Sequence, residues 1–417
     1  MTPSKRKISA VMVIALLHDE YEHDICKKSR KVWMKPWLRK RENFYHMTLL
    51  KELKENNPED YRNYLRMTDN AFRDLLSLVS PKITKKDTVM RKSIPAEERL
   101  IATLRFLATG RSLEDLKFST GISAQALGHI ISETCQAIYD ALRNEYLKFP
   151  TTSGEWKKIA DDFYLLWNFP NCGGAIDGKH VSIVPPSNSG SYYFNYKGYF
   201  SVVLMAIVNA NLEFLMVDVG KNGRISDGGI IEDTVFYKKL IEGTLNLPQN
   251  NETKYGLNFV FIGDEAFALH EHLQNPFPQR ELTYEKKIYN YRLSRARRVV
   301  ENAFGVLSNV FRVFHTSIAL KPEKIDRVVL ASCVLHNFLR RNCRNSYTPL
   351  NMTDFENIES GIVSDADWRK DSNDAHFTNL QALGQRNASD AAKNARLSYV
   401  AYFNGDGKVP WQDRLIK

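Results

Sequence analysis

The stretch GGAIDGKHVSI, residues 173–183, decides how the rest of the chain is interpreted. It predicts an apolar strand that is interrupted by one carboxylate, Asp177, with glycines close by on both sides. A carboxylate on such a strand is costly to bury unless it pairs with a cation or binds a metal ion. Gly178 leaves room for a ligand or a second backbone to approach. We therefore expect Asp177 to face a partner of opposite charge.

Two further acidic residues repeat this situation. Asp264 follows the apolar run FVFIG, residues 259–263, which predicts a second buried strand. Glu301 lies beside the apolar face of a helix predicted over residues 294–310. Two aspartates at strand ends can meet on adjacent strands, and the segment between Asp264 and Glu301 is long enough for a helix that returns to the sheet. The pattern favours three carboxylates at one end of a mixed sheet.

Three carboxylates can bind two hard divalent cations such as Mg²⁺, and Mn²⁺ is expected to substitute for it. Two ions held close together support displacement at a phosphodiester, one at the attacking oxygen and one at the leaving oxygen. Other interpretations stay open for each residue taken singly. Strand-end aspartates often cap turns, and Glu301 can pair with Arg297 one helical turn before it. Acidic residues that compete for the second position are Asp218, Asp227 and Asp233.

Basic residues accompany the acids and suggest contacts with DNA. Arg295, Arg297 and Arg298 precede Glu301 on the predicted helix, and we expect them to contact phosphates. Lys179 and Lys197 are further candidates for DNA contacts.

The 417 residues are enough for two or three domains. We expect a basic arm over residues 1–45, a helical region over 46–150, an α/β domain over 165–345 and a polar linker with a terminal helix over 346–417. Strands are predicted at residues 172–184, 199–209, 213–219 and 259–262, and helices at 61–79, 95–108, 124–142, 229–240, 294–310, 324–341 and 391–403.

The basic arm includes Arg39, Lys40 and Arg41 and contains two tryptophans, Trp33 and Trp37. Such a segment is typical of a nuclear-import signal or of an arm that binds the DNA backbone. A solvated helix face whose tryptophans pack on the protein fits the spacing equally well.

Residues 112–134 have the pattern of a helix-turn-helix motif, with a serine cap, a short helix, a break at Gly121 and a longer helix. In such a motif the second helix would offer Gln125 and His129 to a major groove of double-stranded DNA. A plain helical hairpin is the alternative.

Composition narrows the classes of function. A net charge of +10 suggests a polyanionic partner without identifying it. The five cysteines are scattered and include no CxxC pair, so neither a disulfide framework nor a cysteine zinc site is indicated. No run of residues is long and apolar enough for a membrane span, and we expect no membrane partner.

Several of these segments together resemble the PIF/Harbinger superfamily of DNA transposases and its domesticated nuclease-like relatives. The segments that carry the resemblance are GAIDGKH (174–180), NYKGYFSVVLMA (195–206), GDEAF (263–267), RVVENAFG (298–305), LHNF (335–338) and YFNGDGKVPWQ (402–412). The match to the second-aspartate segment departs at Phe267, where a tyrosine is commoner.

The resemblance implies an RNase H-like fold and a DDE nuclease that cuts DNA and joins the 3′-hydroxyl to a target, with Asp177, Asp264 and Glu301 as metal ligands. It also implies a helical DNA-binding region, a nuclear location and a Myb-like or MADF-like partner protein. Bringing two DNA ends together leads us to expect a homodimer or higher oligomer. The alternatives are a domesticated adaptor that binds DNA or chromatin without catalysis, and an RNase H-like nuclease acting on RNA.

Overall fold

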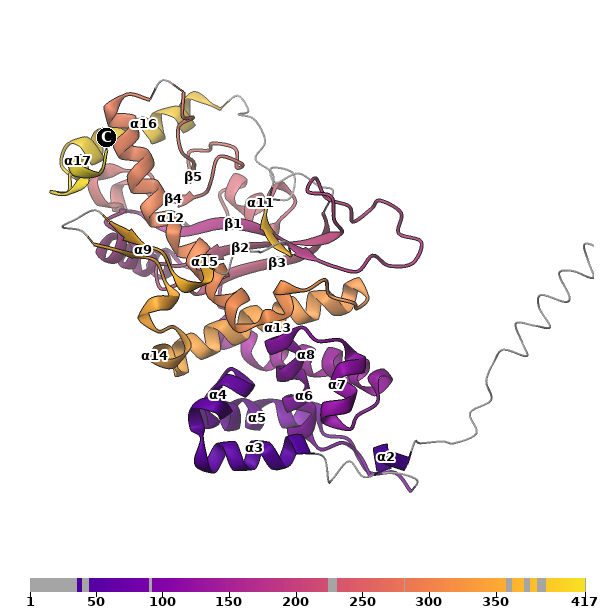
Figure 1. Cartoon of the computed structure of the whole chain (residues 1–417). Coiled ribbons are helices and arrows are strands. Elements are labelled where there is room, and N and C mark those ends of the chain that lie inside the picture. Colours follow the sequence, from indigo (N-terminus) through magenta and orange to yellow (C-terminus); the bar gives the residue numbers. More distant parts are fainter. Residues whose placement is uncertain are drawn as a thin grey trace, which may run out of the picture.

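The computed structural model describes residues 36–39, 45–89, 92–223, 231–280, 282–357, 362–370, 376–380 and 388–416. In this part of the chain a mixed sheet lies among helices, and a separate group of helices packs below it (Figure 1). The predicted combination of an α/β region with a preceding helical region is present. None of the described helices is long and apolar enough to cross a membrane.

The central sheet has six strands, of which five run in the order β3-β2-β1-β4-β5 and the sixth, β8, pairs with β1. Their bounds are β1 Cys172–Ser182, β2 Ser201–Val208, β3 Phe214–Asn222, β4 Val260–Ile262, β5 Leu273–Gln274 and β8 Phe377–Asn379. The pairs β1–β2, β2–β3 and β1–β8 are antiparallel, whereas β1–β4 and β4–β5 are parallel. All eight residues of β2 are buried, as expected for an apolar strand that is covered on both faces.

Strands β4 and β8 share one edge of β1. β4 pairs with residues between Cys172 and Ala175, and β8 pairs with residues Lys179 to Val181. Asp177 therefore lies on β1 between the ends of its two neighbours. β8 comes from the stretch that we interpreted as a polar linker, and no pattern in the sequence predicted it.

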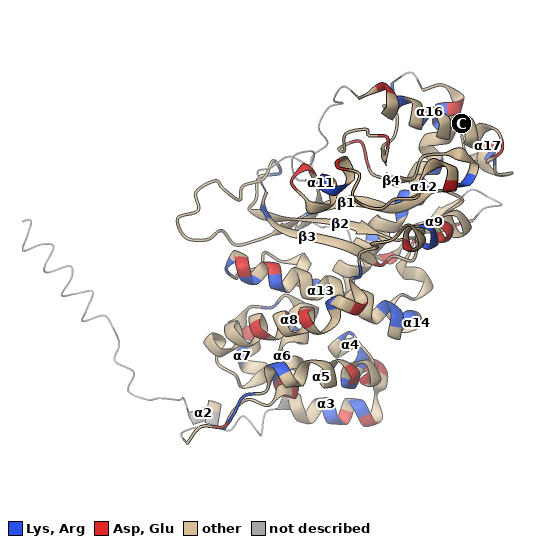
Figure 2. Cartoon of the chain, turned by 180° about the vertical axis from the view of Figure 1, so that it is seen from behind, with Lys and Arg blue, Asp and Glu red and all other residues tan. Residues whose placement is uncertain are grey.

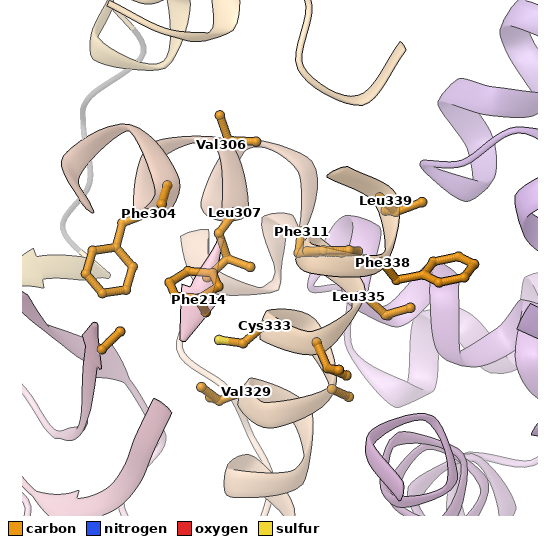
Figure 3. Close-up of a cluster of buried hydrophobic side chains, with 14 of the residues drawn as sticks. Phe214, Phe304, Val306, Leu307, Phe311, Val329, Cys333, Leu335, Phe338 and Leu339 are labelled. Atoms are coloured by element: carbon orange, nitrogen blue, oxygen red, sulfur yellow. The ribbon is translucent and has the colours of Figure 1, made fainter. Parts of the chain in front are cut away.

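Helices cover both faces of the sheet. On one face the core includes residues of α12 (Tyr284–Val310) and α13 (Pro322–Asn342), and on the other it includes residues of α9 (Ser153–Trp167) and α11 (Val235–Ile241). Figure 3 shows the first core where Phe214 of β3 meets Leu307 of α12 and Val329 of α13. Helix α12 starts ten residues earlier than predicted, at an N-cap where the Thr283 side chain accepts from the Lys286 amide.

The helical region shares this core with the sheet, because α8 packs against α13 (Figure 1). The Tyr146 and Phe338 rings meet edge to face at 5.3 Å, and the Asn337 side chain donates to the Tyr146 carbonyl at 2.6 Å. The helices of this region are α2 Pro36–Arg39, α3 Tyr45–Asn56, α4 Pro58–Leu65, α5 Asp69–Ile83, α6 Ala96–Thr109, α7 Leu113–Thr120 and α8 Ala124–Tyr146.

One predicted helix divides in two. The single helix expected over residues 61–79 is wrong, because Arg66 adopts a left-handed conformation with φ of 61° and Thr68 caps a new helix. An αL residue ends an α-helix, and a threonine cap starts the next one by accepting from the Ala71 amide.

Short elements follow α13, namely α14 Arg344–Tyr347, β6 Phe355–Glu356, β7 Val363–Ser364 and α15 Asp367–Lys370. The terminal helices are α16 Asp390–Asn404 and α17 Gln412–Leu415. The 3₁₀ helices along the chain are Asn250–Glu252, Lys254–Gly256, Arg312–His315 and Leu350–Met352.

Candidate active site

Asp177 and Asp264 lie next to each other on neighbouring parallel strands. Ala175 of β1 is in register with Ile262 of β4, and each aspartate comes two residues after its strand's member of that pair. Because side chains alternate between the faces of a sheet, both carboxylates belong to the face that packs against α12. The prediction that the two aspartates meet on adjacent strands agrees with this register, but Asp177 lies within β1 and only Asp264 follows the end of its strand.

The charge of Asp177 affects the ionisation of Asp264. Burial, and then the charge of Asp177, raises the pKa of Asp264 to about 6. The backbone amide of Ala266 donates to Asp264 at 3.0 Å and partly offsets this effect. Two adjacent carboxylates that disfavour one another's charge are an environment that a bound cation would stabilise.

Glu301 reaches the same place from α12, but it is already paired. Its carboxylate accepts from Arg297 at 2.5 Å and from Arg369 of α15 at 2.8 Å. Burial raises the pKa of Glu301, but the two arginines outweigh burial and leave the pKa lowered. The i,i+4 pair with Arg297 is the one that sequence spacing allowed.

Arg297 joins the three acids. Burial lowers the pKa of Arg297, but Glu301, Asp177 and Asp264 together outweigh burial and leave it raised. All three carboxylates therefore act on one guanidinium, which brings them together at one end of the sheet; we call Asp177, Asp264 and Glu301 the acid pole.

The donor set partly fits divalent cations. Asp177 and Asp264 are hard oxygen donors with mutual repulsion, which is the chemistry that Mg²⁺ relieves. Within the described residues, however, no three His, Cys, Asp or Glu side chains converge closely enough to hold a metal ion. Both oxygens of Glu301 are paired, one with Arg297 and one with Arg369. A complete set of three ligands requires Glu301 to leave at least one of these arginines.

A segment between α14 and α16 covers the acid pole, and sequence reasoning missed it. Arg369 bonds both Glu301 and the buried Asp354, which holds it at 2.7 Å. The Trp368 ring lies so close to Gly305 that a Cβ there would meet it at 2.2 Å. Leu380 lies equally close to Gly178, but on the face of β1 opposite to Asp177. We call residues 354–357, 362–370 and 376–380 the covering segment. Its polar composition and irregular spacing gave no signal of this packing.

The expected phosphate contacts of Arg295 and Arg298 need correction. Arg295 is 7% exposed and pairs with Glu356 at 2.7 Å, and it also donates to the Trp167 carbonyl. Arg298 lies 3.6 Å from the same glutamate. These guanidinium groups are neutralised by a carboxylate of the covering segment, so they fix that segment to α12 and do not face solvent.

The lysines predicted to contact DNA differ in exposure. Lys179 follows Asp177 on the same face of β1, lies 3.8 Å from its carboxylate and bonds Asn379 of β8. Lys197 is exposed, with its ammonium 5.6 Å from the centre of the Tyr196 ring. Lys197 is therefore open to a ligand beside the acid pole, whereas Lys179 is held within it.

Residues of the helical region lie apart from the acid pole. α7 and α8 meet at Gly121, whose φ is 64°, and Ser123 caps α8, so the two helices and their tight turn form where predicted. Gln125 and His129 are exposed one turn apart on α8. The use of this pair to read DNA stays a prediction. The side chains of Arg39, Lys40 and Arg41 lie outside the described residues.

Comparison with known proteins points to a family of endonucleases. Residues 176–337 match the model of the DDE superfamily endonucleases, a range that contains Asp177, Asp264 and Glu301. This family implies an RNase H-like fold, with which the mixed sheet agrees. No solved structure matches the chain.

Curated relatives point to the same group. The chain is 25% identical to the rat "Putative nuclease HARBI1" over 63% of this chain and 72% of the relative. It is 25% identical to the Arabidopsis thaliana "Protein ALP1-like" over 68% and 71%, and 24% identical to the human "Putative nuclease HARBI1" over 63% and 72%. The DDE endonuclease match and these relatives support a DDE transposase-like protein of the Harbinger superfamily.

Proposed function

We propose that this protein cuts and joins DNA phosphodiesters as a DDE-type nuclease, using two Mg²⁺ or Mn²⁺ ions bound by Asp177, Asp264 and Glu301. The observation that carries the proposal is the register of β1 and β4, which sets Asp177 beside Asp264 under the helix of Glu301. The relatives called putative nucleases support the class of reaction.

The residues of the acid pole have different roles in this proposal. Asp177 and Asp264 bind the cations, because their own mutual repulsion is relieved by positive charge. Glu301 completes the ligand set after it separates from Arg369. Two bound divalent ions would activate the attacking oxygen and stabilise the leaving oxygen of the phosphodiester. Lys179 and Lys197 place positive charge beside the acids and orient the phosphate backbone of the strand.

Double-stranded DNA is the proposed substrate, and the rest of the chain contributes to binding it. In this proposal Gln125 and His129 of α8 contact the duplex, and Arg39, Lys40 and Arg41 bind its backbone. Joining two DNA ends requires at least two protomers, so we propose a homodimer or higher oligomer that works in the nucleus, with a Myb-like or MADF-like partner. The basic net charge supports a polyanionic substrate.

A second function is favoured by the pairing of Glu301. An acid that is held by both Arg297 and Arg369 suits a protein that keeps the fold and binds DNA or chromatin without cutting it. Such an adaptor has no requirement for a free third carboxylate.

Nicking of supercoiled plasmid DNA in Mg²⁺ or Mn²⁺ separates the two functions. The purified wild-type chain is expected to nick, and Asp177→Asn is expected to be inactive. Asp218→Asn is the matched control, because Asp218 lies on β3 of the same sheet, paired with Met205. Equal nicking by all three proteins, or none by the wild type at any divalent ion concentration, would contradict the proposed nuclease.

A further inference from the structure

A cavity of about 930 Å³ lies where the end of α9, the turn between β2 and β3, α12 and the α13–α14 corner meet. Figure 2 shows that α14 carries basic residues on this corner of the molecule. We call this space the Arg340 cavity. The residues that line it include Trp167, Asn211, Arg340, Arg344, Thr348 and Asp354.

Arg340 is a buried cation without a carboxylate partner. It is only 7% exposed, and its guanidinium donates to the Asn211 carbonyl at 2.6 Å. Among the described residues no carboxylate lies within ion-pair distance of Arg340. Burial, and then the charge of Arg344, lowers the pKa of Arg340. A buried guanidinium is costly unless an anion compensates it.

The next arginine along the chain shows what compensation looks like. Arg341 binds both oxygens of Glu213, at 2.9 and 3.0 Å, in a two-pronged pair. This arrangement takes up Glu213, the acid nearest to Arg340 along the turn between β2 and β3. In the sequence pair Arg340-Arg341, Glu213 therefore binds the outer arginine directly and acts on Arg340, which lines the cavity, only through its charge.

Two more donors line the same cavity without acceptors. Arg344 is exposed on α14, and within the described part of the chain no carboxylate pairs with it. The Thr348 hydroxyl is buried and has no hydrogen-bond partner. The one acid in the lining, Asp354, is occupied by Arg369 and by the Ala366 amide. The cavity therefore offers donors and positive charge in excess.

An aromatic ring forms part of the wall. Trp167 is partly exposed, and its indole N–H donates to the Ala210 carbonyl at 3.2 Å, which fixes the ring beside the cavity. A fixed aromatic face next to anion-binding arginines is the combination by which proteins bind single-stranded nucleic acid, with phosphate on the cation and base or sugar on the ring.

The cavity lies a short way along the sheet from the acid pole. Asp177 is paired with Ala206 of β2, and the cavity is lined by Ala210 and Asn211 in the turn after the end of β2 at Val208. At about 3.3 Å per strand residue, β2 carries the chain about 7 Å from Ala206 to Val208, and the turn lies beyond that point. A DNA strand rises about 3.4 Å per nucleotide, so about two nucleotides span the strand part of this separation.

We propose that the Arg340 cavity is a subsite that binds a backbone phosphate of a DNA strand, through Arg340, Arg344 and Thr348, a few nucleotides from the acid pole. The proposal deepens the function proposed above and rests on it for the identity of the strand. Its chemistry, a phosphate anion on two arginines and a hydroxyl, rests on the cavity alone.

The test measures DNA binding in the Asp177→Asn background, where strand cutting cannot disturb it. The probe is a fluorescent 20-nucleotide DNA, single-stranded and as a duplex, followed by anisotropy over a series of salt concentrations. Arg344→Gln is expected to weaken binding about threefold to tenfold and to lower the slope of log Kd against log salt by about one. Arg340→Gln is expected to do the same.

Arg143→Gln is the matched control, because Arg143 is an exposed arginine on α8 that does not line the cavity. Arg344 is exposed, so a loss of binding in Arg344→Gln cannot be ascribed to a failure to fold. Equal Kd values and salt slopes for Arg344→Gln and Arg143→Gln would overturn the proposal.

Inorganic phosphate is the second probe. In the DNA-strand proposal it competes with the oligonucleotide only weakly, at millimolar concentration. The proposal fails if inorganic phosphate raises the Tm of the protein that keeps Arg344 but not of Arg344→Gln, while both proteins bind the DNA with the same Kd. In that case the ligand of the cavity is a free phosphate compound and not a DNA strand. A wild type that never nicks DNA, together with the expected loss in Arg344→Gln, contradicts the proposed nuclease and supports this subsite.

Discussion

The acid pole and the Arg340 cavity both contain buried charged groups whose charged form is disfavoured, but the charges have opposite sign. At the pole, Asp264 is an anion beside another anion, and its pKa is raised to about 6 by burial and by Asp177. In the cavity, Arg340 is a cation with no carboxylate at ion-pair distance among the described residues, and burial lowers its pKa although the charge of Glu213 partly opposes this. Each charged form is disfavoured by its surroundings, and each would be stabilised by a ligand of opposite sign. Folding alone leaves both unsatisfied, which is typical of places where a ligand binds.

The largest expected effect removes one anion from the acid pole. Asp264→Asn is expected to lower the rate of plasmid nicking by at least about 10³-fold, because a metal ligand is lost. The same change is expected to raise the free energy of unfolding by about 1–2 kcal/mol, since it ends the repulsion with Asp177. Nicking assays and urea unfolding measure the two effects. A variant that is both less stable and fully active would show that the pole is an ordinary structural cluster.

His336 is a contrasting case, a buried polar side chain in which both ring nitrogens have hydrogen-bond partners. Its ring bonds the Leu212 carbonyl at 2.7 Å and the Tyr347 hydroxyl at 2.9 Å, and burial lowers its pKa to about 3. His336→Leu leaves both partners unpaired, so we expect a loss of about 2–4 kcal/mol in urea unfolding at pH 7.5.

The same residue has a predictable pH dependence. Because its pKa is lower in the folded protein than in the unfolded chain, the unfolded state binds the proton more readily. His336 therefore contributes a loss of stability as the pH falls from about 6.5 toward 3, and His336→Leu should lose less stability over that range than the wild type. His129→Leu, an exposed histidine on α8, serves as the control and should follow the wild type.

Arg369 tests how firmly the acid pole is closed. Arg369→Gln removes the charge that holds Glu301 but keeps a hydrogen-bond donor for Asp354. We expect Mn²⁺ to bind about threefold to tenfold more tightly, seen as a rise in Tm at lower Mn²⁺ concentration. Lys370→Gln, whose partner is Asp367, should respond like the wild type. An unchanged Mn²⁺ response in Arg369→Gln would mean that Glu301 does not bind the ion.

The smallest effect on DNA binding is expected from the exposed surface of α8, where Gln125 and His129 are open to solvent. The double change Gln125→Ala and His129→Ala should weaken binding to duplex DNA about threefold, measured by anisotropy. Gln136→Ala, on the same helix but bonded to Asp140, should leave the Kd unchanged. A larger loss than that of Arg344→Gln would move the main DNA contact from the cavity to the helical region.

The sequence predicted those parts of the site that depend on local pattern. Asp177 interrupts one apolar strand and Asp264 follows another, and that pattern marks both as carboxylates beside a buried sheet. Glu301 lies on a helix whose apolar periodicity is clear, although the helix begins earlier than its strongest periodic run. These residues were predictable because burial and period are read over a few neighbouring positions.

The remainder depends on partners that are distant in the chain. Arg295 precedes a predicted metal ligand and was expected at DNA, but its partner Glu356 comes 61 residues later. β8 is a polar three-residue strand whose place is set by an existing edge of β1. Among the described residues Arg340 has no direct carboxylate partner, whereas the neighbouring Arg341 binds Glu213, and no spacing indicates which arginine pairs. A pattern in one sequence does not indicate which of several residues distant in the chain will form a pair.

The shared edge of β1 also orders events during synthesis. Asp177, Asp264 and Glu301 leave the ribosome before the covering segment, and domains begin to fold from the N-terminal side as they emerge. Until Phe377–Asn379 has been made, the edge of β1 beyond Asp177 lacks its partner strand, and Glu301 lacks Arg369. The nascent protein therefore passes through a stage in which Asp177, Asp264 and Glu301 have been synthesised but Arg369, the second arginine that pairs with Glu301, has not.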